Sequence, residues 1–487
     1  MNADVLVIGG GLAATWTAVA AAQAGGDVVL ADKGYCGTSG VTATAGVTHW
    51  FVPPSRHEAA IAERHAHAGG LADPEQTLRV LRTTWERLPT LDKHYPFPMQ
   101  DGEPDRTHNV RGPEYLRAMR GLVHRAGVRI LDHHPALELL LRPDGSVGGA
   151  AGVRRQAGGN WQVRAGAVVL ATGGTAFRSH LLGSRGNTGD GHLMAVEAGA
   201  RLSGMEFSNY YTLAPAYSTM ARSMTYLFGT YTDADGRRID LPPGADRTRV
   251  LATAMLRGPV LATLDRAPGW VRRKMPVVQP NFLLPFARRG IDPYTQPFEV
   301  TLLGEGTIRG VGGLVVSAPD CATGVPGLFA AGDVASRVPI VGAISGGGSP
   351  NSAWAVSSGT WAGRAAVRYA RSATFAPVRP SGRAGIRPSR RPSAVDTTAV
   401  IGAVREELNA YDKNMFRDEH GLRSSLSILD GLWAEVEGGL TGIGRNALVA
   451  RETASLVAMG RWVKEAALRR RETLGMHWRT DGQEAAA

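Results

Sequence analysis

The stretch that most constrains the fold is "VLVIGGGLAA" (residues 5–14), where an apolar run meets three consecutive glycines. Residues 5–8 have the length of a buried strand, and the alanine-rich residues 12–24 hold no proline and favour a helix. "DVVLAD" (27–32) then has the pattern of a second strand. The order of these segments predicts a βαβ unit with the glycines in its first turn.

Within that turn, Gly9, Gly11 and Ala14 match the spacing G-x-G-x-x-A. The first allows a tight turn, the second lets the backbone approach a pyrophosphate, and the third keeps helix and strand close. The helix that follows presents free N–H groups and a positive dipole end to phosphates. Asp32 ends the second strand, where a carboxylate can accept hydrogen bonds from ribose hydroxyls. The pattern predicts a dinucleotide site, with close packing alone as the alternative for the glycines.

The segment after Asp32 favours FAD over NAD. "DKGYCGTSGVTATAGV" (32–47) continues with small and hydroxylated residues instead of a third amphipathic βα unit, as expected if the backbone follows a longer ligand. Two further glycine-rich strand ends, "AVVLATGG" (167–174) and "GLFAAGDVA" (327–335), follow far downstream. We therefore expect a nucleotide domain built from separated segments.

Composition limits the classes of partner and site. The formal net charge of +11 is carried almost entirely by arginine, and much of it lies in "RYARSATFAPVRPSGRAGIRPSRRPS" (368–393), which has no apolar period. We interpret this segment as a solvated linker and not a nucleic-acid tail, because its aromatic residues stand only near its start. A basic interior pocket for an anionic substrate is also compatible with the charge. Cys36 and Cys321 lack zinc or iron–sulfur spacing, so we expect no metal site.

The chain resembles flavoproteins of the fumarate reductase, succinate dehydrogenase, aspartate oxidase and adenylylsulfate reductase superfamily. Besides the segments above, "NTGDGHLMAVEAGARLSGMEF", "NSAWAVSSGTWAG" and "RRRETLGMHWRTD" occur in that family's order. The resemblance implies an α/β fold: a Rossmann-type, glutathione-reductase-like FAD-binding domain with an inserted α+β capping domain and a helical C-terminal domain. The implied boundaries are 1–204 and 321–370 for the FAD-binding domain, 205–320 for the cap, 371–395 for the Arg/Pro/Ser-rich linker and 396–487 for the helical domain.

The resemblance also assigns residues to the cofactor, and all of them fall on matching motif positions. They are Gly9, Gly11, Ala14, Asp32, Lys33, Ser39, Gly40, Ala45, Gly46, Ala136, Ala171, Thr172, Gly173, Asp190, Gly332, Asp333, Asn351 and Ser352. Asp333 matches the acid that the family points at the ribityl chain, with a helix N-cap as the alternative role. Asn351 and Ser352 match positions near the flavin pyrimidine edge, at the start of another helix, where the dipole favours negative charge on the reduced ring.

One motif position bears on how the flavin is attached. Family members with covalent FAD use a histidine after the serine of "S-H-T", and Gly40 stands at that place in "TSGVT". The resemblance therefore implies non-covalent FAD.

The dicarboxylate-handling positions of the family are altered. Tyr211 in "MEFSNYYTLAP" and Ile308 in "IRGVGG" stand where the family has histidines, and Ser345 in "VGAISGGGSPNS" lies near the place of its substrate-clamping arginine. A housekeeping fumarate reductase or succinate dehydrogenase is therefore disfavoured.

Several residues are candidates to replace these groups. Arg309 adjoins the missing histidine, and a guanidinium can bind a carboxylate with two hydrogen bonds. Arg249, with Arg247 beside it, lies near the family's capping-domain arginine, which supplies a proton. Each arginine also has an ordinary surface role as its alternative. Tyr210 and Tyr211 either donate to a substrate oxygen or pack beneath the cap. We take Arg309, Arg249 and Tyr211 as the catalytic candidates.

These features predict a soluble, cytoplasmic FAD-dependent oxidoreductase. It would transfer a hydride between flavin N5 and a small, carboxylated substrate, by C–C desaturation or reduction or by C–N oxidation, in specialised metabolism. The alternative is a flavin-binding electron-relay subunit with an iron–sulfur partner protein, and a flavoprotein scaffold without catalysis is a third possibility. We expect a small anionic substrate and neither nucleic acid nor a membrane as a partner. A homo-oligomer and an electron-transfer partner both stay open.

Overall fold

A mixed β-sheet organises the part of the chain that holds the glycine-rich motifs. The computed structural model describes residues 1–107, 110–220, 223–242, 244, 246–317 and 319–482. The strand order is β18-β8-β9-β10-β1-β2-β7, and β17 also pairs with β10. Strands β17, β10, β1, β2 and β7 run parallel, whereas β9, β8 and β18 are antiparallel. The strands of this main sheet are β1 (Asn2–Ile8), β2 (Val28–Ala31), β7 (Arg129–Leu131), β8 (Ala136–Leu141), β9 (Val147–Val153), β10 (Asn160–Leu170), β17 (Leu328–Ala330) and β18 (Arg379–Pro380).

Helices cover the parallel part of the main sheet, so its strands carry continuous apolar runs. Helices α1 and α11 pack along each other at close range. A Cβ on Gly363 of α11 would lie 2.4 Å from the Thr17 carbonyl oxygen of α1, which only a glycine avoids. The helices of this part are α1 (Leu12–Gln23), α2 (His57–His65), α3 (Pro74–Arg87), α4 (Gly112–Arg125), α5 (Asp190–Glu197), α10 (Val338–Val341) and α11 (Ser349–Ala370).

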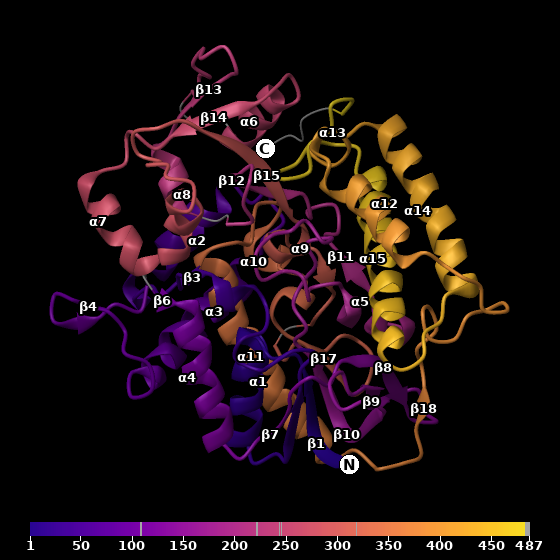
Figure 1. Ribbon diagram of the computed structural model, residues 1–487. Coiled ribbons are helices and arrows are strands. Elements are labelled where there is room, and N and C mark those ends of the chain that lie inside the picture. Colours follow the sequence, from indigo (N-terminus) through magenta and orange to yellow (C-terminus); the bar gives the residue numbers. More distant parts are fainter. Residues whose placement is uncertain (108–109, 221–222, 243, 245, 318, 483–487) are drawn as a thin grey trace.

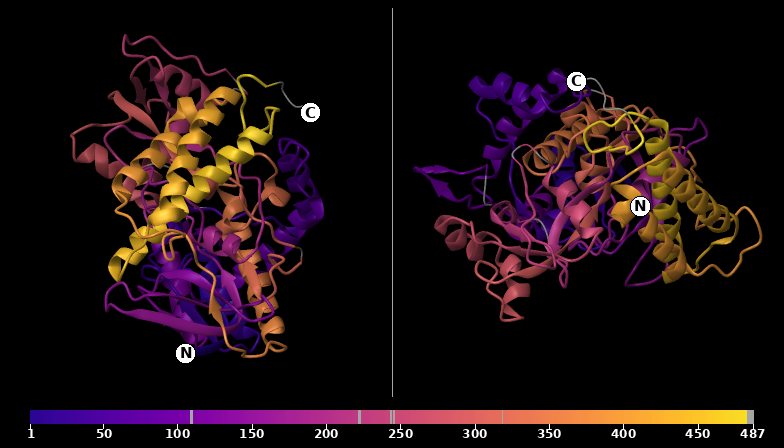
Figure 2. Two further views of the ribbon diagram at one scale, coloured as in Figure 1. Left: turned by 90° about the vertical axis from the view of Figure 1, so that its right-hand side faces the viewer. Right: turned by 90° about the horizontal axis from the view of Figure 1, so that it is seen from above.

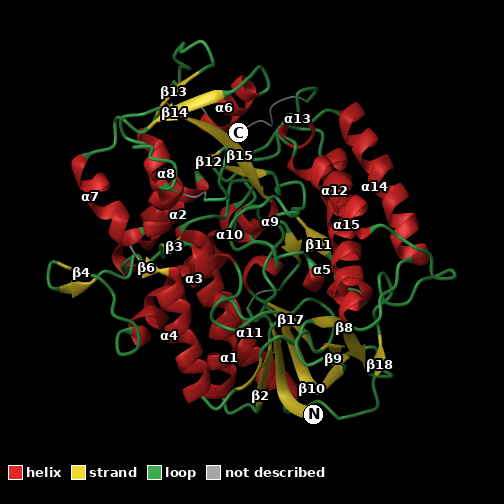
Figure 3. Cartoon of the chain, viewed as in Figure 1, coloured by secondary structure: helices red, strands yellow, loops and turns green. Residues whose placement is uncertain are grey.

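A second, antiparallel sheet with its own buried core lies between β10 and β17 in the sequence. Its strand order is β12-β15-β14-β13, and we call residues 210–305 the inserted unit. Figure 1 shows this unit at the top of the molecule, and Figure 3 shows its strands apart from the main sheet. Its elements are β12 (Tyr210–Pro215), β13 (Thr230–Thr232), β14 (Val260–Thr263), β15 (Phe298–Glu305), α6 (Arg247–Met255), α7 (Gly269–Val278) and α8 (Pro280–Ala287), and α9 (Gly306–Arg309) follows directly.

Long helices near the C-terminal end form a third layer, which we call the helical unit (residues 397–469). They pack side by side around a separate apolar cluster and lie along one side of the molecule (Figure 2). Helix α15 also contacts α5. The helices are α12 (Thr397–Asn409), α13 (Tyr411–Asn414), α14 (Glu419–Gly439) and α15 (Arg445–Arg469).

Most residues of the arginine-rich segment 371–395 are exposed, and the segment also contacts the main sheet and the helical unit. It supplies the edge strand β18, and Arg387 pairs with Glu138 of β8 at 2.7 Å. The backbone N–H of Arg390 donates to the Gly438 carbonyl at the end of α14. Strand pairing between distant segments gives no local sequence signal, so composition alone did not indicate β18.

Short elements complete the described chain. They are the paired strands β3 (Gly46–Val47) and β6 (Val110–Arg111), β4 (Met99–Gln100) and β5 (Glu103–Pro104), and β11 (Leu202–Ser203) and β16 (Gly313–Leu314), and the 3-10 turns η1 (Val41–Thr44), η2 (Pro54–Arg56), η3 (Leu88–Leu91), η4 (Met224–Phe228) and η5 (Gly332–Val334). Within the described ranges, every helix is too short or too polar to cross a bilayer.

Candidate active site

A cavity of about 1630 Å³ lies where the main sheet, the inserted unit and the helical unit meet. Gly9 from the end of β1, Thr219 from the inserted unit and Arg405 from α12 all line it. Pockets for drug-sized ligands hold roughly 300–1,000 Å³, so this one has room for an extended ligand and a second small molecule. The parallel strands end at this cavity, which is where ligands bind in open α/β sheets.

The glycine-rich turn forms one wall and leaves space for a phosphate. Gly9 has φ 126°, and a Cβ there would lie 2.2 Å from the Ala171 carbonyl oxygen. Helix α1 begins at Leu12 without any side-chain cap, so its first N–H groups face the cavity free to bind an anion. Gly40 and Gly348 also line the cavity, and no described atom lies within 4 Å of the position a Cβ would take. The wall therefore fits a dinucleotide of the FAD type.

The structure brings together nearly all the cofactor residues expected from the sequence. Those that line the cavity are Gly9, Gly11, Asp32, Lys33, Ser39, Gly40, Ala45, Gly46, Ala136, Ala171, Thr172, Gly173, Asp190, Gly332, Asp333, Asn351 and Ser352. Ala14 does not line it, because its side chain is fully buried on α1, where the small residue lets the helix approach the sheet.

Asp32 lies in the cavity wall beside the glycine turn. The Ser39 hydroxyl donates to its carboxylate, and a Cβ on Gly10 would clash with that carboxylate at 2.2 Å. Burial raises the pKa of Asp32, although the hydrogen bond from Ser39 acts in the opposite direction. A carboxylate held at this place can accept a hydrogen bond from a ligand hydroxyl.

A chain of buried charges connects the main sheet to the helical unit across the cavity. Lys33 pairs with Asp190 and, at 2.9 Å, with Glu452 of α15. Arg178 pairs with the other oxygen of Glu452 at 2.7 Å. Burial alone would raise the pKa of Asp190, but Lys33 and the hydrogen bonds to the carboxylate hold it below its usual value. Glu452 thus holds α15 against the strand end that carries Lys33.

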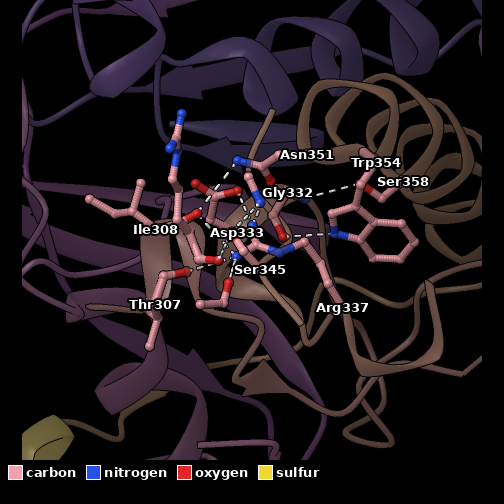
Figure 4. A network of polar contacts seen from close by, with 12 residues as sticks. Thr307, Ile308, Gly332, Asp333, Arg337, Ser345, Asn351, Trp354 and Ser358 are labelled. Atoms are coloured by element: carbon pink, nitrogen blue, oxygen red, sulfur yellow. Dashed lines mark hydrogen bonds and ion pairs between the residues drawn. The ribbon is translucent and has the colours of Figure 1, made fainter. Parts of the chain in front are cut away.

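Arg337 ties three segments together beneath the cavity (Figure 4). Its side chain is 1% exposed, and it pairs with Asp333 of η5, the turn that follows β17. Nη1 also donates to Asn351 Oδ1 at 2.6 Å, at the start of α11. Nη2 donates to the carbonyl oxygens of Thr307 and Ile308 at 2.8 and 3.1 Å, and to that of Gly310. One guanidinium therefore positions two predicted flavin residues relative to the loop that carries Arg309.

Arg309 lines the cavity next to the inserted unit. Its Nη1 donates to the Tyr210 hydroxyl at 3.3 Å, and its Nε lies 3.7 Å from Oε1 of the fully buried Glu305. Burial lowers the pKa of Arg309, but Glu305 and Tyr210 more than offset this and the pKa is raised. The guanidinium is therefore a fixed cation whose remaining donors can bind an anion.

The structure does not bring the other two catalytic candidates to the cavity. Tyr211 is 2% exposed, and its hydroxyl accepts from Asn414 Nδ2 at 3.3 Å. Successive strand residues point to opposite faces, so Tyr210 faces Arg309 while Tyr211 packs inward. Arg249 stacks 4.2 Å from the Trp478 ring and lies 3.7 Å from Asp246.

Ser345, expected near the missing clamp, contacts the backbone of its own loop and of Arg309. Its hydroxyl donates to the Arg309 carbonyl at 3.1 Å, and the backbone N–H of Gly347 donates to it at 3.1 Å. The loop after α10 is thereby held against Arg309. The inserted unit also contacts the segment after β10, since the Leu182 N–H donates to the Thr219 carbonyl oxygen at 3.3 Å.

The sequence argument missed three residues that shape the site: Arg337, Glu305 and Glu452. Arg337 offered a signal, because it is charged within the apolar run "VASRVPIVG" and stands four residues after Asp333. Glu305 and Glu452 offered none, since each acts on a partner brought near by folding. In the described ranges, no three His, Cys, Asp or Glu side chains gather as a metal ion would require.

Comparisons with a family model, with known proteins and with solved structures agree with one another. A family model described as "FAD binding domain" matches residues 4–350. The chain is 24% identical to an uncharacterised FAD-dependent oxidoreductase of Methanocaldococcus jannaschii, with 99% of this chain and 94% of that protein covered. It is 26% identical to L-aspartate oxidase of Streptomyces coelicolor, with 98% and 88% covered. The structure matches E. coli quinol fumarate reductase FrdA with a TM-score of 0.83 and 20% identity, over 100% of this chain and 92% of that chain.

Proposed function

The chain belongs to the FAD binding domain family and is an FAD-dependent oxidoreductase related to fumarate reductases and aspartate oxidases, and we propose that its substrate is a small carboxylate held by Arg309. The reaction in this proposal is hydride transfer between flavin N5 and the substrate, as C–C desaturation or reduction or as C–N oxidation. The single observation that carries the proposal is the partly exposed cation at Arg309, paired with the buried Glu305, in a cavity with room for cofactor and substrate.

The chain's own residues hold and orient the substrate in this proposal. Arg309 binds the carboxylate, and Glu305 and Tyr210 fix the guanidinium so that little side-chain entropy is lost on binding. Arg337 keeps the Arg309 loop at a set place relative to Asp333 and Asn351. FAD, when bound, supplies the ring that accepts or donates the hydride.

The domain roles remain part of the proposal. We assign residues 1–204 and 321–370 to FAD binding, 205–320 to a cap over the substrate, and 396–487 to a helical domain that closes the outer side of the cavity. The contact between Thr219 and Leu182 and the pairing of Lys33 with Glu452 support these roles. Neither Arg249 nor Tyr211 lines the cavity, and we therefore leave both out of the proposed chemistry.

The substrate proposal is tested with Arg309→Gln and Arg309→Lys in the FAD-loaded protein. Small mono- and dicarboxylates and α-amino acids are titrated against the flavin absorbance band and assayed with dioxygen or a dye as acceptor. We expect Arg309→Gln to lower kcat/KM by roughly tenfold to a hundredfold, because a hydrogen bond to a charged group contributes about 1.5–3 kcal/mol.

Arg249→Gln is the matched control, and it should keep both binding and turnover. Unchanged kinetics in Arg309→Gln would remove Arg309 from the site. Turnover that appears only when an iron–sulfur protein is added would favour the electron-relay role instead.

Non-covalent attachment of FAD is also part of the proposal, and it rests on Gly40 at the position of the family's linking histidine. We expect acid precipitation of the yellow protein to leave the flavin in the supernatant. Flavin that stays with the polypeptide would contradict this.

A further inference from the structure

Helices α7 and α8 form a basic hairpin on the inserted unit, which we call the α7–α8 face (residues 269–291). These residues include five basic and no acidic side chains, although acidic residues are frequent in the rest of the chain. In Figure 1 the two helices lie at the outer edge of the molecule, on the side away from the helical unit. A stretch of this composition attracts negatively charged partners and repels positively charged ones.

The exposed side of α7 combines cations with large apolar side chains. Trp270, Arg273, Lys274 and Val277 recur at the spacing i, i+3, i+4 and i+7, so they share one helix face. Trp270 is 49% exposed and Val277 is 67% exposed. The opposite side of α7 packs into the apolar core of the inserted unit.

Helix α8 continues this surface. Phe282 and Phe286 are buried and anchor the helix on the core, where each packs against other aromatic rings. Leu284 is 40% exposed and Arg288 is exposed. The hairpin therefore leaves apolar and cationic groups uncovered on both of its helices.

Three of the five cations are available for a partner. Arg272 donates to the Ala267 and Asp265 carbonyl oxygens, and Arg289 stacks 4.0 Å from the Tyr217 ring. Arg273, Lys274 and Arg288 form no ion pair with any residue in the described part of the chain. Arg273 and Lys274 thus share a face of α7 with Trp270 and Val277, and Arg288 adds an exposed charge at the end of α8.

These charges decide among the possible occupants. A second copy of the chain would bring like cations together in a two-fold contact, which is unfavourable. An anionic bilayer surface fits every group: its headgroups attract the cations, indole rings favour the headgroup level, and Val277 and Leu284 can enter the acyl boundary. We propose that the α7–α8 face binds the surface of membranes that contain anionic lipids. Binding of this kind needs no spanning helix and does not depend on the substrate proposal. It departs from the expectation, drawn from the sequence, that a membrane is not a partner.

The test is sedimentation of the FAD-loaded full chain with two kinds of vesicle: phosphatidylcholine alone, and equal parts of phosphatidylcholine and phosphatidylglycerol. We expect binding to the anionic vesicles only, and release by salt. The double variant Arg273→Glu with Lys274→Glu should weaken partitioning by at least roughly thirtyfold, because each basic residue near an anionic surface contributes about 1 kcal/mol. Trp270→Ser with Val277→Ser should also weaken it.

The matched control is Arg423→Glu with Arg469→Glu, two exposed cations on α14 and α15, which should bind vesicles like the unaltered protein. Flavin content and melting temperature verify that each variant is folded. Equal binding to both kinds of vesicle, or equal loss in the control, would overturn the proposal. Salt-sensitive retention on polyglutamate without vesicle binding would also overturn it and assign the face to an acidic protein.

Discussion

At the scale of single residues, Arg337 is the side chain on which the site's geometry depends most. It is almost fully buried and its two terminal nitrogens bond to groups from η5, α11 and the segment after β15. A guanidinium offers rigid, planar donors, so it can satisfy a carboxylate and several carbonyl oxygens at once. No other residue type reproduces that pattern.

Replacement of Arg337 by Met should therefore strongly destabilise the protein. The change removes a buried positive charge beside Asp333 and takes donors from the Thr307 and Ile308 carbonyl oxygens. We expect the free energy of unfolding to fall by about 3–5 kcal/mol, as when one member of a buried pair is lost. The flavin-to-protein ratio after purification should fall with it. Denaturant titration and absorbance measure the two quantities.

Two comparisons separate this effect from a general loss of charge. Arg337→Lys keeps the charge without the fork and should be intermediate in both measurements. Arg423→Met removes an exposed pair with Glu419 and should cost no more than about 1 kcal/mol. If Arg337→Met cost as little, the network would have no structural role.

At the scale of elements, the approach of α1 to α11 sets the position of the phosphate-binding helix end. Gly363 and Gly359 of α11 face the α1 backbone, with Cβ positions 2.4 Å from the Thr17 and 2.7 Å from the Ala13 carbonyl oxygens. Backbone atoms cannot move aside as a flexible side chain can. The N-terminus of α1 therefore keeps its place only while α11 has glycine at these positions.

Gly363→Ala should push α1 away from α11. We expect a loss of about 1–3 kcal/mol in unfolding free energy, which is typical of an overpacked interface, and a weaker affinity for FAD. Titration of the apoprotein with FAD and thermal unfolding measure both. Gly431→Ala on α14 is the control, because a Cβ there meets nothing within 4 Å and should stabilise by about 0.5–1 kcal/mol. Equal effects of the two changes would refute the packing argument.

The sequence predicted the elements whose signals are local. The expected strand, helix and strand of residues 5–32 correspond to β1, α1 and β2, because apolar runs and the glycine turn are contiguous there. Strand β18 was missed, since its only support is a partner far away in the sequence. Which of Tyr210 and Tyr211 faces Arg309 also required the pleat of β12, because a tyrosine suits either face of a strand.

At the scale of the whole molecule, the cavity exists only because three layers meet around it. Gly9, Gly11 and Asp32 could be named from the sequence itself, since the glycine turn is a local structure, and the other cofactor residues were implied by the family resemblance. Arg337, Glu305 and Glu452 could not, because their roles depend on partners supplied by other layers. The structure also places Arg249 and Tyr211 away from the cavity. Matching motif positions in the sequence could not decide whether these two side chains reach it.

Burial of histidines makes the folded molecule sensitive to acid. Burial lowers the pKa of His49 and of His192 to about 4 and that of His477 to about 3, from the ordinary 6.5. As the pH falls below 6.5, the unfolded chain binds these protons first while the folded chain does not. Stability is therefore full above pH 6.5 and is lost as the pH falls toward 4.

His192 gives the sharpest test, because neither of its ring nitrogens has a hydrogen-bond partner in the described part of the chain. His192→Leu should leave the unfolding free energy at pH 7.5 equal or higher, since an apolar side chain of similar size loses no bond. Between pH 6.5 and 4.5 its stability should fall less steeply than that of the unaltered protein, by up to about 1.4 kcal/mol per pH unit, the value for one proton. Denaturant titrations at successive pH values measure the two curves. Parallel curves would mean that His192 takes its proton equally readily in the folded and unfolded chain, and the acid sensitivity would then have to come from other groups.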